Sequence, residues 1–312
     1  MNASFNHKIL GAVLGGFGMF LAAALPGAPS ALARELTDAT GVQVALVDRP
    51  SRVVTLIPSL GELAAEVLGE DLERIVGVSE YTDYPPAIAA AGKRVTSIGP
   101  YTRVDLEKIL ALKPDLVLAS TDGNSRDQIQ HLRELKIPVV VVKTESLGDV
   151  ESAMRLVADA IGSSERGRAI SGQFAAGLAR IRARGGELVK SRARPLKVLL
   201  QLDDRPLVVV GKKSFLHDAL GVVGAENIYG DAGAGYPRPA LEDVIRRNPD
   251  VIVVIGMGGN AGPFKVMASR WEKFPSLSAV KNKRIRVVDG DSLTRPTLRL
   301  LEGLSLLERA LR

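Results

Sequence analysis

Two glutamates occupy equivalent positions in two similar stretches of this sequence. Residues 104–120 read VDLEKILALKPDLVLAS, and residues 239–256 read PALEDVIRRNPDVIVVIG. Each stretch places a glutamate, Glu107 or Glu242, seven residues before Pro-Asp and then continues as an apolar run. A carboxylate early in a helix is favoured by the helix dipole. Two equivalent carboxylates could also each pair with an arginine of a two-fold symmetric partner. The residues alone leave both explanations open.

The remaining residue types argue against catalysis and against a metal site. The chain has no cysteine, which excludes disulfides, thiol chemistry and a lipoprotein anchor. Its three histidines, His7, His131 and His217, are too few for a metal cluster, and no Ser/His/Asp set is apparent. We therefore expect no catalytic residues, no bound metal and no cofactor.

One glycine-rich segment supports a distant enzyme alternative. GMGGNAG at 256–262 follows an apolar run and loosely resembles a dinucleotide-binding turn. A ribose-binding acid at a strand end about 20 residues further on is not evident, and no acid–base pair accompanies the turn. A Rossmann-type dinucleotide enzyme thus remains only the distant alternative.

The bulk composition is that of a globular protein with room for two domains. The chain has 312 residues, of which 46% are hydrophobic and 24% charged. The formal net charge is +6, but Lys and Arg are mixed with Asp and Glu and form no basic block. We therefore expect no nucleic-acid partner.

The N-terminus has the pattern of an export signal. Lys8 precedes the apolar stretch ILGAVLGGFGMFLAAALPGA, which is followed by the small-residue site Ala-Leu-Ala ending at Ala33. A membrane anchor is the alternative, although glycines and a proline interrupt the apolar stretch. We expect cleavage after Ala33, so that residues 1–33 are a signal peptide and the mature chain is periplasmic.

The rest of the chain alternates between strand and helix patterns, interrupted once. Strands are predicted at 51–59, 74–81, 115–120, 138–143, 197–204 and 284–291, and helices at 60–69, 104–112, 126–137, 214–224 and 296–312. The second repeated stretch, 239–256, supplies a further helix followed by a strand. Short connections and continuously apolar strands favour mainly parallel sheets. Residues 151–194 contain only helical patterns. We therefore expect an α/β fold with two Rossmann-like lobes, 34–150 and 195–312, joined by one long α-helix, with a helix hairpin inside one domain as the alternative.

The loops that follow the two repeated strands are candidates for a ligand site. They contain residues 121–124 and 256–260. Ligands bind beyond the carboxyl ends of strands in open parallel sheets. Two lobes that face each other would therefore line a shared cleft with these loops.

Several segments resemble the substrate-binding proteins of ABC importers for metal chelates, the class with a single long connecting helix. They are SRVVTLIPSLGELAAEVL, GVSEYTDYPP, LEKILALKPDLVLAS, GAENIYGD and the second Leu-Glu-Asp stretch. The resemblance covers nearly all of the mature chain. GVSEYTDYPP, and the Gly123-Asn124 loop with Gln128, resemble the cobalamin-binding branch most. The resemblance implies a monomer that captures a metal chelate between its lobes and delivers it to an ABC permease dimer at the inner membrane.

The resemblance also implies roles for particular residues. In this family each lobe docks on the two-fold permease through one glutamate, and the matching residues are Glu107 and Glu242. The implied ligand contacts are Tyr81, Tyr101, Tyr236, Asp291, Arg295 and Asn124. Tyrosines supply flat apolar area with a polar tip, which suits a broad macrocycle carrying amides.

The sequence departs from the cobalamin-binding pattern at two of these positions. Tyr101 and Tyr236 stand where the best-studied branch commonly has tryptophan. Tyrosine can bind ferric iron, so haem is an alternative ligand, although neither His131 nor His217 is an obvious partner. A ferric siderophore is a further alternative, for which basic residues would be needed; the candidates are Lys93, Arg103, Arg238 and Arg295. A periplasmic scaffold or sensor would keep the fold without needing both glutamates.

Overall fold

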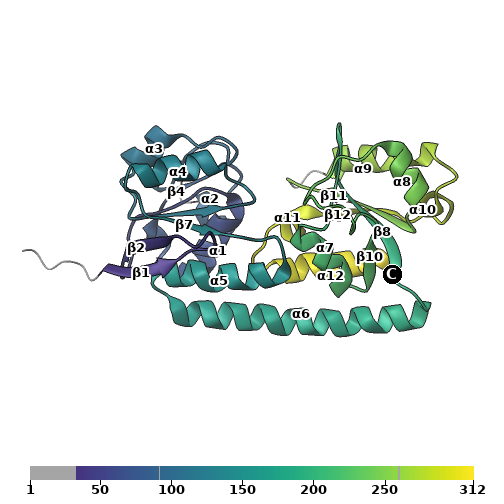
Figure 1. The fold of residues 1–312 in the computed structure, drawn as a ribbon, viewed down its shortest axis with the longest axis horizontal. Helices are drawn as coiled ribbons and strands as arrows, with labels where there is room; N and C mark the ends of the chain where they lie inside the picture. Colours follow the sequence, from purple (N-terminus) through teal and green to yellow (C-terminus); the bar gives the residue numbers. More distant parts are fainter. Residues whose placement is uncertain (1–32, 91, 259–260) are drawn as a thin grey trace, which may run out of the picture. The chain divides into compact units, whose positions relative to one another are not determined.

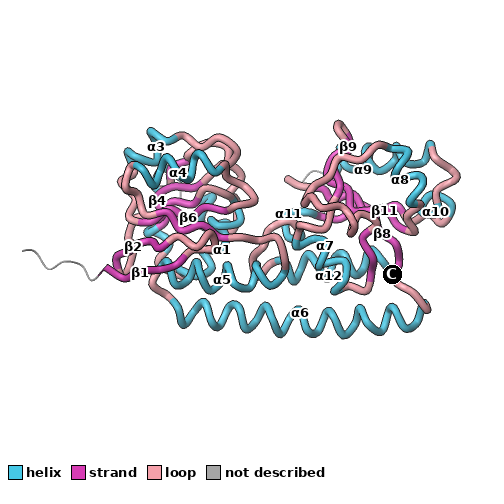
Figure 2. Tube along the Cα trace, viewed as in Figure 1, coloured by secondary structure: helices cyan, strands magenta, loops and turns pink. Residues whose placement is uncertain are grey.

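The computed structural model describes residues 33–90, 92–258 and 261–312. Apart from Ala33, the predicted signal peptide lies outside these residues. In the described part of the chain, no helix is long and apolar enough to cross a membrane. Two five-stranded sheets organise the fold, and we call the parts built on them the N-lobe and the C-lobe (Figures 1 and 2).

The N-lobe is built on a parallel sheet with the strand order β5-β4-β3-β6-β7. Its strands are β3 (Val53–Thr55), β4 (Ile75–Val78), β5 (Thr96–Ser97), β6 (Leu116–Ser120) and β7 (Val139–Val142). Its helices are α1 (Pro58–Leu68), α2 (Pro86–Ala90), α3 (Leu106–Ala111), α4 (Arg126–Glu134) and α5 (Leu147–Ile161), and an antiparallel hairpin of β1 (Ala33–Thr37) and β2 (Gln43–Val47) precedes the sheet. All residues of β6 and β7 are buried, because helices cover both sheet faces.

The C-lobe repeats this architecture with the strand order β10-β8-β11-β12, all parallel, and β9 pairs antiparallel with β8. Its strands are β8 (Leu196–Asp204), β9 (Leu207–Val209), β10 (Ala225–Asn227), β11 (Val251–Gly256) and β12 (Ile285–Asp289). Its helices are α7 (Phe215–Val222), α8 (Leu241–Arg247), α9 (Ala261–Ser269), α10 (Ser278–Lys281), α11 (Gly290–Leu293) and α12 (Leu300–Leu311). The predicted fold class, two α/β lobes with mainly parallel sheets, is confirmed.

One long helix connects the lobes. The helix α6 (Ser164–Arg192) has 29 residues, a length of about 44 Å at 1.5 Å per residue, and passes along both lobes (Figure 1). A side chain at Gly185 would place its Cβ 2.3 Å from the Val222 carbonyl oxygen, so α6 and α7 pack closely. Arg184 on α6 also donates to the buried Glu308 on α12, with 2.9 Å between Nε and Oε2. The C-lobe end of α6 is therefore fixed by packing and by charge.

The apolar core is continuous from one lobe to the other. One buried cluster contains residues of both sheets together with Met154 of α5, Phe174 of α6 and Leu304 of α12. Two smaller clusters fill the opposite sheet faces, one under α3 and α4 and the other under α8 and α10. Because a shared core resists separation of the lobes, we expect only small changes in lobe spacing when a ligand binds.

Candidate ligand-binding site and docking surface

Among the Phe, Trp and Tyr side chains of the described residues, the exposed ones are all tyrosines, and they are four of the five tyrosines in the chain. They are Tyr81, Tyr84, Tyr101 and Tyr236, and all lie in loops. Tyr81 follows β4 and Tyr101 follows β5, at the carboxyl edge of the N-lobe sheet. Tyr81 is 73% exposed and has a φ of 64°, a left-handed conformation that is uncommon for a bulky residue. Such backbone conformations concentrate at ligand-binding sites.

Tyr236 in the C-lobe lies within electrostatic reach of the N-lobe loops. Its hydroxyl lies 3.3 Å from the Ser214 hydroxyl. Partial burial raises the pKa of the Tyr236 phenol, and the charges of Asp122 and Tyr101 add to the rise, whereas the hydrogen bond with Ser214 opposes it. The charges of two N-lobe residues, Asp122 and Tyr101, thus influence a tyrosine of the C-lobe.

Asn124 lies beneath this surface rather than on it. The side chain is 7% exposed. Its Nδ2 donates to the Tyr101 carbonyl oxygen at 3.2 Å, and its Oδ1 accepts the Ser120 N–H at 3.0 Å. Because backbone groups occupy both ends of the amide, the geometry favours a role in holding the Tyr101 loop over the predicted direct ligand contact.

Asp122, in the same loop, was not singled out by the sequence reasoning. Its Oδ2 accepts from the Thr144 backbone N–H at 2.8 Å and from the Thr144 hydroxyl at 2.6 Å. These bonds tie the loop after β6 to the chain after β7. The position after a buried strand marks the whole loop 121–124 as a candidate, but only the resemblance to the chelate-binding family assigned a role within it, to Asn124.

Arg295 bridges the two lobes. Its Nη2 lies 2.8 Å from Asp83 Oδ1 and donates to the Tyr81 carbonyl oxygen at 3.2 Å, and its Nη1 lies 3.5 Å from Glu62 Oε2. The side chain is only 12% exposed. Arg295 therefore adjoins the predicted contact Tyr81, but two carboxylates already balance its charge.

Glu62 is a functional candidate that the sequence reasoning missed. It lies on α1 and is 2% exposed. Thr297 Oγ1 donates to its Oε1 at 2.5 Å, and Arg299 Nη1 lies 3.2 Å from its Oε2. Burial raises the pKa of the Glu62 carboxyl, and Thr297, Arg299 and Arg295 oppose that rise. The sequence did contain a signal, a glutamate inside the apolar helix LGELAAEVLG. Because a charged side chain is rarely buried without a partner, such a glutamate indicates a buried ion pair.

Glu66 lies one turn further along α1 and leads to a prediction about pH. Burial raises the pKa of its carboxyl from 4.5 to about 7, and Glu62 adds to the rise, whereas the Leu298 N–H and Arg166 oppose it. A raised folded-state pKa gives stability that is present below pH 4.5 and is lost as the pH rises through about 7. We expect Glu66→Gln to raise the free energy of unfolding at pH 8 by up to about 3 kcal/mol, and to change it little at pH 4. Urea unfolding at both pH values measures this, and an equal effect at both would contradict the assignment.

Asp291 supports the glycine-rich turn after β11. Its Oδ1 accepts the Gly258 N–H at 3.0 Å, and the neighbouring Met257 is 45% exposed. Residues 259 and 260 of this turn lie outside the described part of the chain. Asp291 lies just after β12, at the carboxyl edge of the C-lobe sheet, and shapes the turn there.

Glu107 and Glu242 occupy matching positions in the two lobes. Each lies in the first turn of its helix, α3 and α8 respectively, and each is exposed. Within the described ranges neither carboxylate has a hydrogen-bond or ion-pair partner. Figure 1 shows α3 and α8 on the side of the molecule opposite to α6. Both carboxylates are thus available to a partner that approaches this side.

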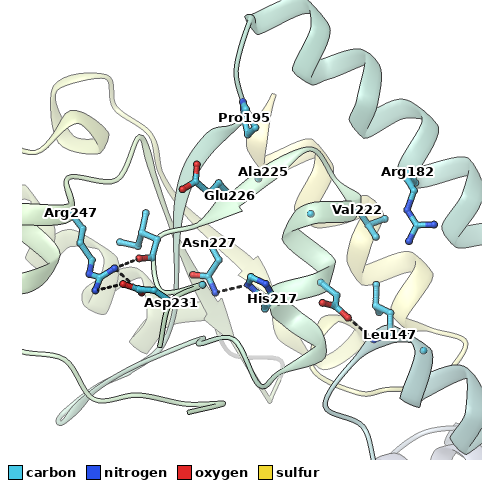
Figure 3. A pocket seen from close by; sticks show the side chains of 15 residues that line it. Leu147, Arg182, Pro195, His217, Val222, Ala225, Glu226, Asn227, Asp231 and Arg247 are labelled. Atoms are coloured by element: carbon cyan, nitrogen blue, oxygen red, sulfur yellow. Dashed lines mark hydrogen bonds and ion pairs between the residues drawn. The ribbon is translucent and has the colours of Figure 1, made fainter. Parts of the chain in front are cut away.

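A large surface cavity lies elsewhere. It has a volume of about 870 Å³ and is lined by residues of α7, β10 and α6, among them His217, Glu226 and Arg182 (Figure 3). Its described lining includes none of the predicted ligand contacts. His217 Nδ1 lies 3.5 Å from Asn227 Nδ2 in this cavity. His217 is therefore not placed beside the exposed tyrosines.

The chain is similar to proteins of known function. The family model described as periplasmic binding protein matches residues 53–292. The vitamin B12-binding protein of Vibrio vulnificus is 30% identical over 252 residues, which is 80% of this chain and 86% of that protein. The vitamin B12-binding protein of Pectobacterium carotovorum is 30% identical over 224 residues, 72% of this chain and 76% of that protein.

Solved structures show the same likeness. The periplasmic vitamin B12 binding protein BtuF of Vibrio cholerae has a TM-score of 0.70 and 27% identity, and the match covers 84% of this chain and 96% of that one. The periplasmic heme-binding protein RhuT from Roseiflexus has a TM-score of 0.70 and 25% identity, with 84% and 97% covered. The fold is therefore shared by relatives with different ligands.

Proposed function

The chain belongs to the periplasmic binding protein family, and we propose that it is the substrate-binding component of an ABC importer for a cobalamin-like metal chelate. It captures one chelate between its lobes and delivers it to a two-fold permease driven by a cytoplasmic ATPase. Proteins of this family bind and hand over substrates and are not enzymes. The vitamin B12-binding relatives, matched over most of their length, support cobalamin as the ligand.

The observation that carries the proposal is the set of exposed tyrosines contributed by both lobes. Tyr81 and Tyr101 come from the N-lobe and Tyr236 from the C-lobe. Their rings offer flat apolar area, and their hydroxyls can bond to amides at the edge of a macrocycle. Arg295 is already paired with Glu62 and Asp83, so it adds little free positive charge. This combination favours a large, nearly neutral chelate over an anionic siderophore.

Haem is the second candidate ligand. A tyrosine hydroxyl could bind ferric iron, and a heme-binding protein is among the similar structures. However, His217 lines the separate cavity of Figure 3, and His131 is exposed on α4. Haem binding would therefore rely on tyrosine without a histidine from either position.

The docking proposal concerns Glu107 and Glu242. We propose that each pairs with an arginine of one permease subunit. Their equivalent places in two similar lobes, their exposure and their unpaired state in the described structure support this role. A symmetric partner gives a physical reason for repeating the Leu-Glu stretch. Exposed ion pairs individually contribute little, so docking would rely on both.

The remaining proposals concern maturation and organisation. We propose that residues 1–33 are removed during export to the periplasm and that the mature protein acts as a monomer. Residues 34–150 and 195–312 then act as the two lobes, with 151–194 as the connecting helical segment. A periplasmic location is the general property of the family.

Uptake of labelled cyanocobalamin tests the whole proposal. A strain of the source cell that lacks this chain should lose uptake, and a plasmid copy of the wild type should restore it. Growth on hemin as the iron source, measured in the same strains, should be unchanged. Unchanged cobalamin uptake together with lost growth on hemin would contradict cobalamin and favour haem.

A further inference from the structure

Four charged side chains, two acidic and two basic, join the lobes beside the exposed tyrosines. Glu62 and Asp83 belong to the N-lobe, and Arg295 and Arg299 belong to the segment between α11 and α12 of the C-lobe. Two carboxylates and two guanidinium groups cancel in net charge when all are ionised. Glu62 is the most deeply buried of the four, with 3% of its side chain exposed.

Glu62 fixes both arginines at once. Its Oε2 lies 3.2 Å from Arg299 and 3.5 Å from Arg295, while Thr297 between them donates to its other oxygen at 2.5 Å. Arg299 donates a hydrogen bond to Oε2, which sets the orientation of its planar guanidinium group. Arg295 Nη1 has no hydrogen-bond partner among the described residues and is held by the ion pair with Glu62. Glu62 thereby holds the whole segment 295–299 against α1.

The two arginines in turn hold the loop that carries Tyr81. We call residues 79–84 the tyrosine loop. Arg295 donates to the Tyr81 carbonyl oxygen at 3.2 Å and pairs with Asp83 at 2.8 Å. The Arg299 guanidinium carbon lies 3.9 Å from the centre of the Tyr84 ring, a cation–π contact. Both ends of the exposed part of the loop are therefore attached to the C-lobe.

The base of the same loop packs on the helix that carries Glu62. Thr82 Oγ1 donates to the Ser79 carbonyl oxygen at 2.8 Å, which closes the turn. A Cβ at Gly61, the residue before Glu62, would lie 2.4 Å from the Thr82 side chain. The loop thus touches α1 directly at Gly61 and indirectly through the arginines, so Glu62 and Tyr81 belong to one connected unit.

We propose that Glu62 is a positioning residue of the ligand site, which acts through Arg295 and Arg299 to set the conformation of the tyrosine loop and the place of Tyr81. The expected effect of Glu62 on ligand affinity rests on the proposed function. Its expected effect on the conformation of the tyrosine loop does not depend on that function. A buried ion pair often stabilises a protein no more than apolar residues of the same shape would. Glu62 is therefore better explained by the geometry it imposes than by stability alone.

Glu62→Gln tests this role with the least change in shape. We expect the affinity for cyanocobalamin, measured by calorimetry, to fall about tenfold. Tyr81→Ala should cause a similar loss, and the double variant should lose little more than either single one, because both changes disable one unit. Combined with Tyr236→Ala in the other lobe, Glu62→Gln should instead give losses that multiply. Multiplying losses with Tyr81→Ala as well would overturn the proposal.

A second measurement does not depend on the ligand. The protein labelled with 3-fluorotyrosine should give five fluorine resonances, one for each tyrosine. Glu62→Gln should shift or broaden those of Tyr81 and Tyr84 and leave that of Tyr229 unchanged. Glu308→Gln is the matched control, since it removes a buried carboxylate that likewise pairs with two arginines, Arg184 and Arg312, and should leave all five in place. Unchanged Tyr81 and Tyr84 resonances in Glu62→Gln would refute the role of Glu62.

The affinity measurement and the fluorine spectra distinguish a failure of the proposed function from a failure of the proposed role of Glu62. If the wild type binds no cyanocobalamin, the proposed function fails, and the fluorine spectra still decide the role of Glu62. If Glu62→Gln does not fold, as judged by its thermal melt, Thr297→Val replaces it. That variant removes only the 2.5 Å hydrogen bond to Glu62 and should shift the same two resonances by a smaller amount.

Discussion

Uptake should be lost when both docking glutamates are reversed in charge, while the ligand still binds. In the double variant Glu107→Arg and Glu242→Arg, arginines would meet arginines at both permease contacts, and like charges that face each other oppose docking. We expect at least about 100-fold slower uptake of labelled cyanocobalamin, which corresponds to about 1.4 kcal/mol for each tenfold loss. Affinity for cyanocobalamin should stay within about twofold, because neither residue is one of the proposed ligand contacts.

The single variants and a charge-matched control sharpen this experiment. Each single reversal should slow uptake less than the double variant, since one contact remains. Glu165→Arg and Glu187→Arg make the same change of charge at two exposed glutamates of α6, on the side opposite to α3 and α8 (Figure 1), and should affect uptake much less. Normal uptake by the double variant Glu107→Arg and Glu242→Arg would mean that the two carboxylates serve only to stabilise their helices through the helix dipole.

The second large effect is expected at the tyrosines. Tyr101→Ala and Tyr236→Ala should each lower the affinity for the chelate about tenfold, and the double variant about 100-fold, because each removes an aromatic contact from a different lobe. Calorimetry on the purified variants measures this. An affinity that stays within about twofold in the double variant would place the ligand elsewhere, for example in the cavity lined by His217.

Phenylalanine variants at the same positions distinguish the two candidate ligands. Tyr→Phe keeps the flat ring and removes only the hydroxyl. Stacking on cobalamin should survive with about a threefold loss or less. Iron coordination by a tyrosine hydroxyl should instead be abolished, and the visible spectrum of bound hemin would change. Tyr81→Phe, Tyr101→Phe and Tyr236→Phe thus separate an aromatic surface from an iron ligand.

Most of the architecture could be predicted because local patterns of apolar and polar residues determine its main strands and helices. The continuously apolar runs of β6 and β11 and the helical spacing of 163–194 depend only on near neighbours in the sequence. The short strands β5, β9 and β10 and the β1–β2 hairpin were not predicted. With two and three residues, β5 and β9 are too short to show a periodicity, and such strands are defined by their pairing partners.

The site was predictable only in part, for the same reason. The exposed tyrosines follow strand ends, which the strand pattern locates. The partners of Arg295 could not be found in this way, because Glu62 and Asp83 are more than 200 positions away in the sequence. The role of Asn124 likewise depends on the carbonyl of Tyr101, a contact between two loops that no local pattern encodes.

Titration of the mature protein, from Arg34 onward, with cyanocobalamin by calorimetry tests the central claim most directly, with hemin titrated in parallel. We predict tight binding with one cobalamin per protein and little heat from hemin. Absence of cobalamin binding, together with saturable binding of hemin, would contradict the claim and assign the tyrosines to iron.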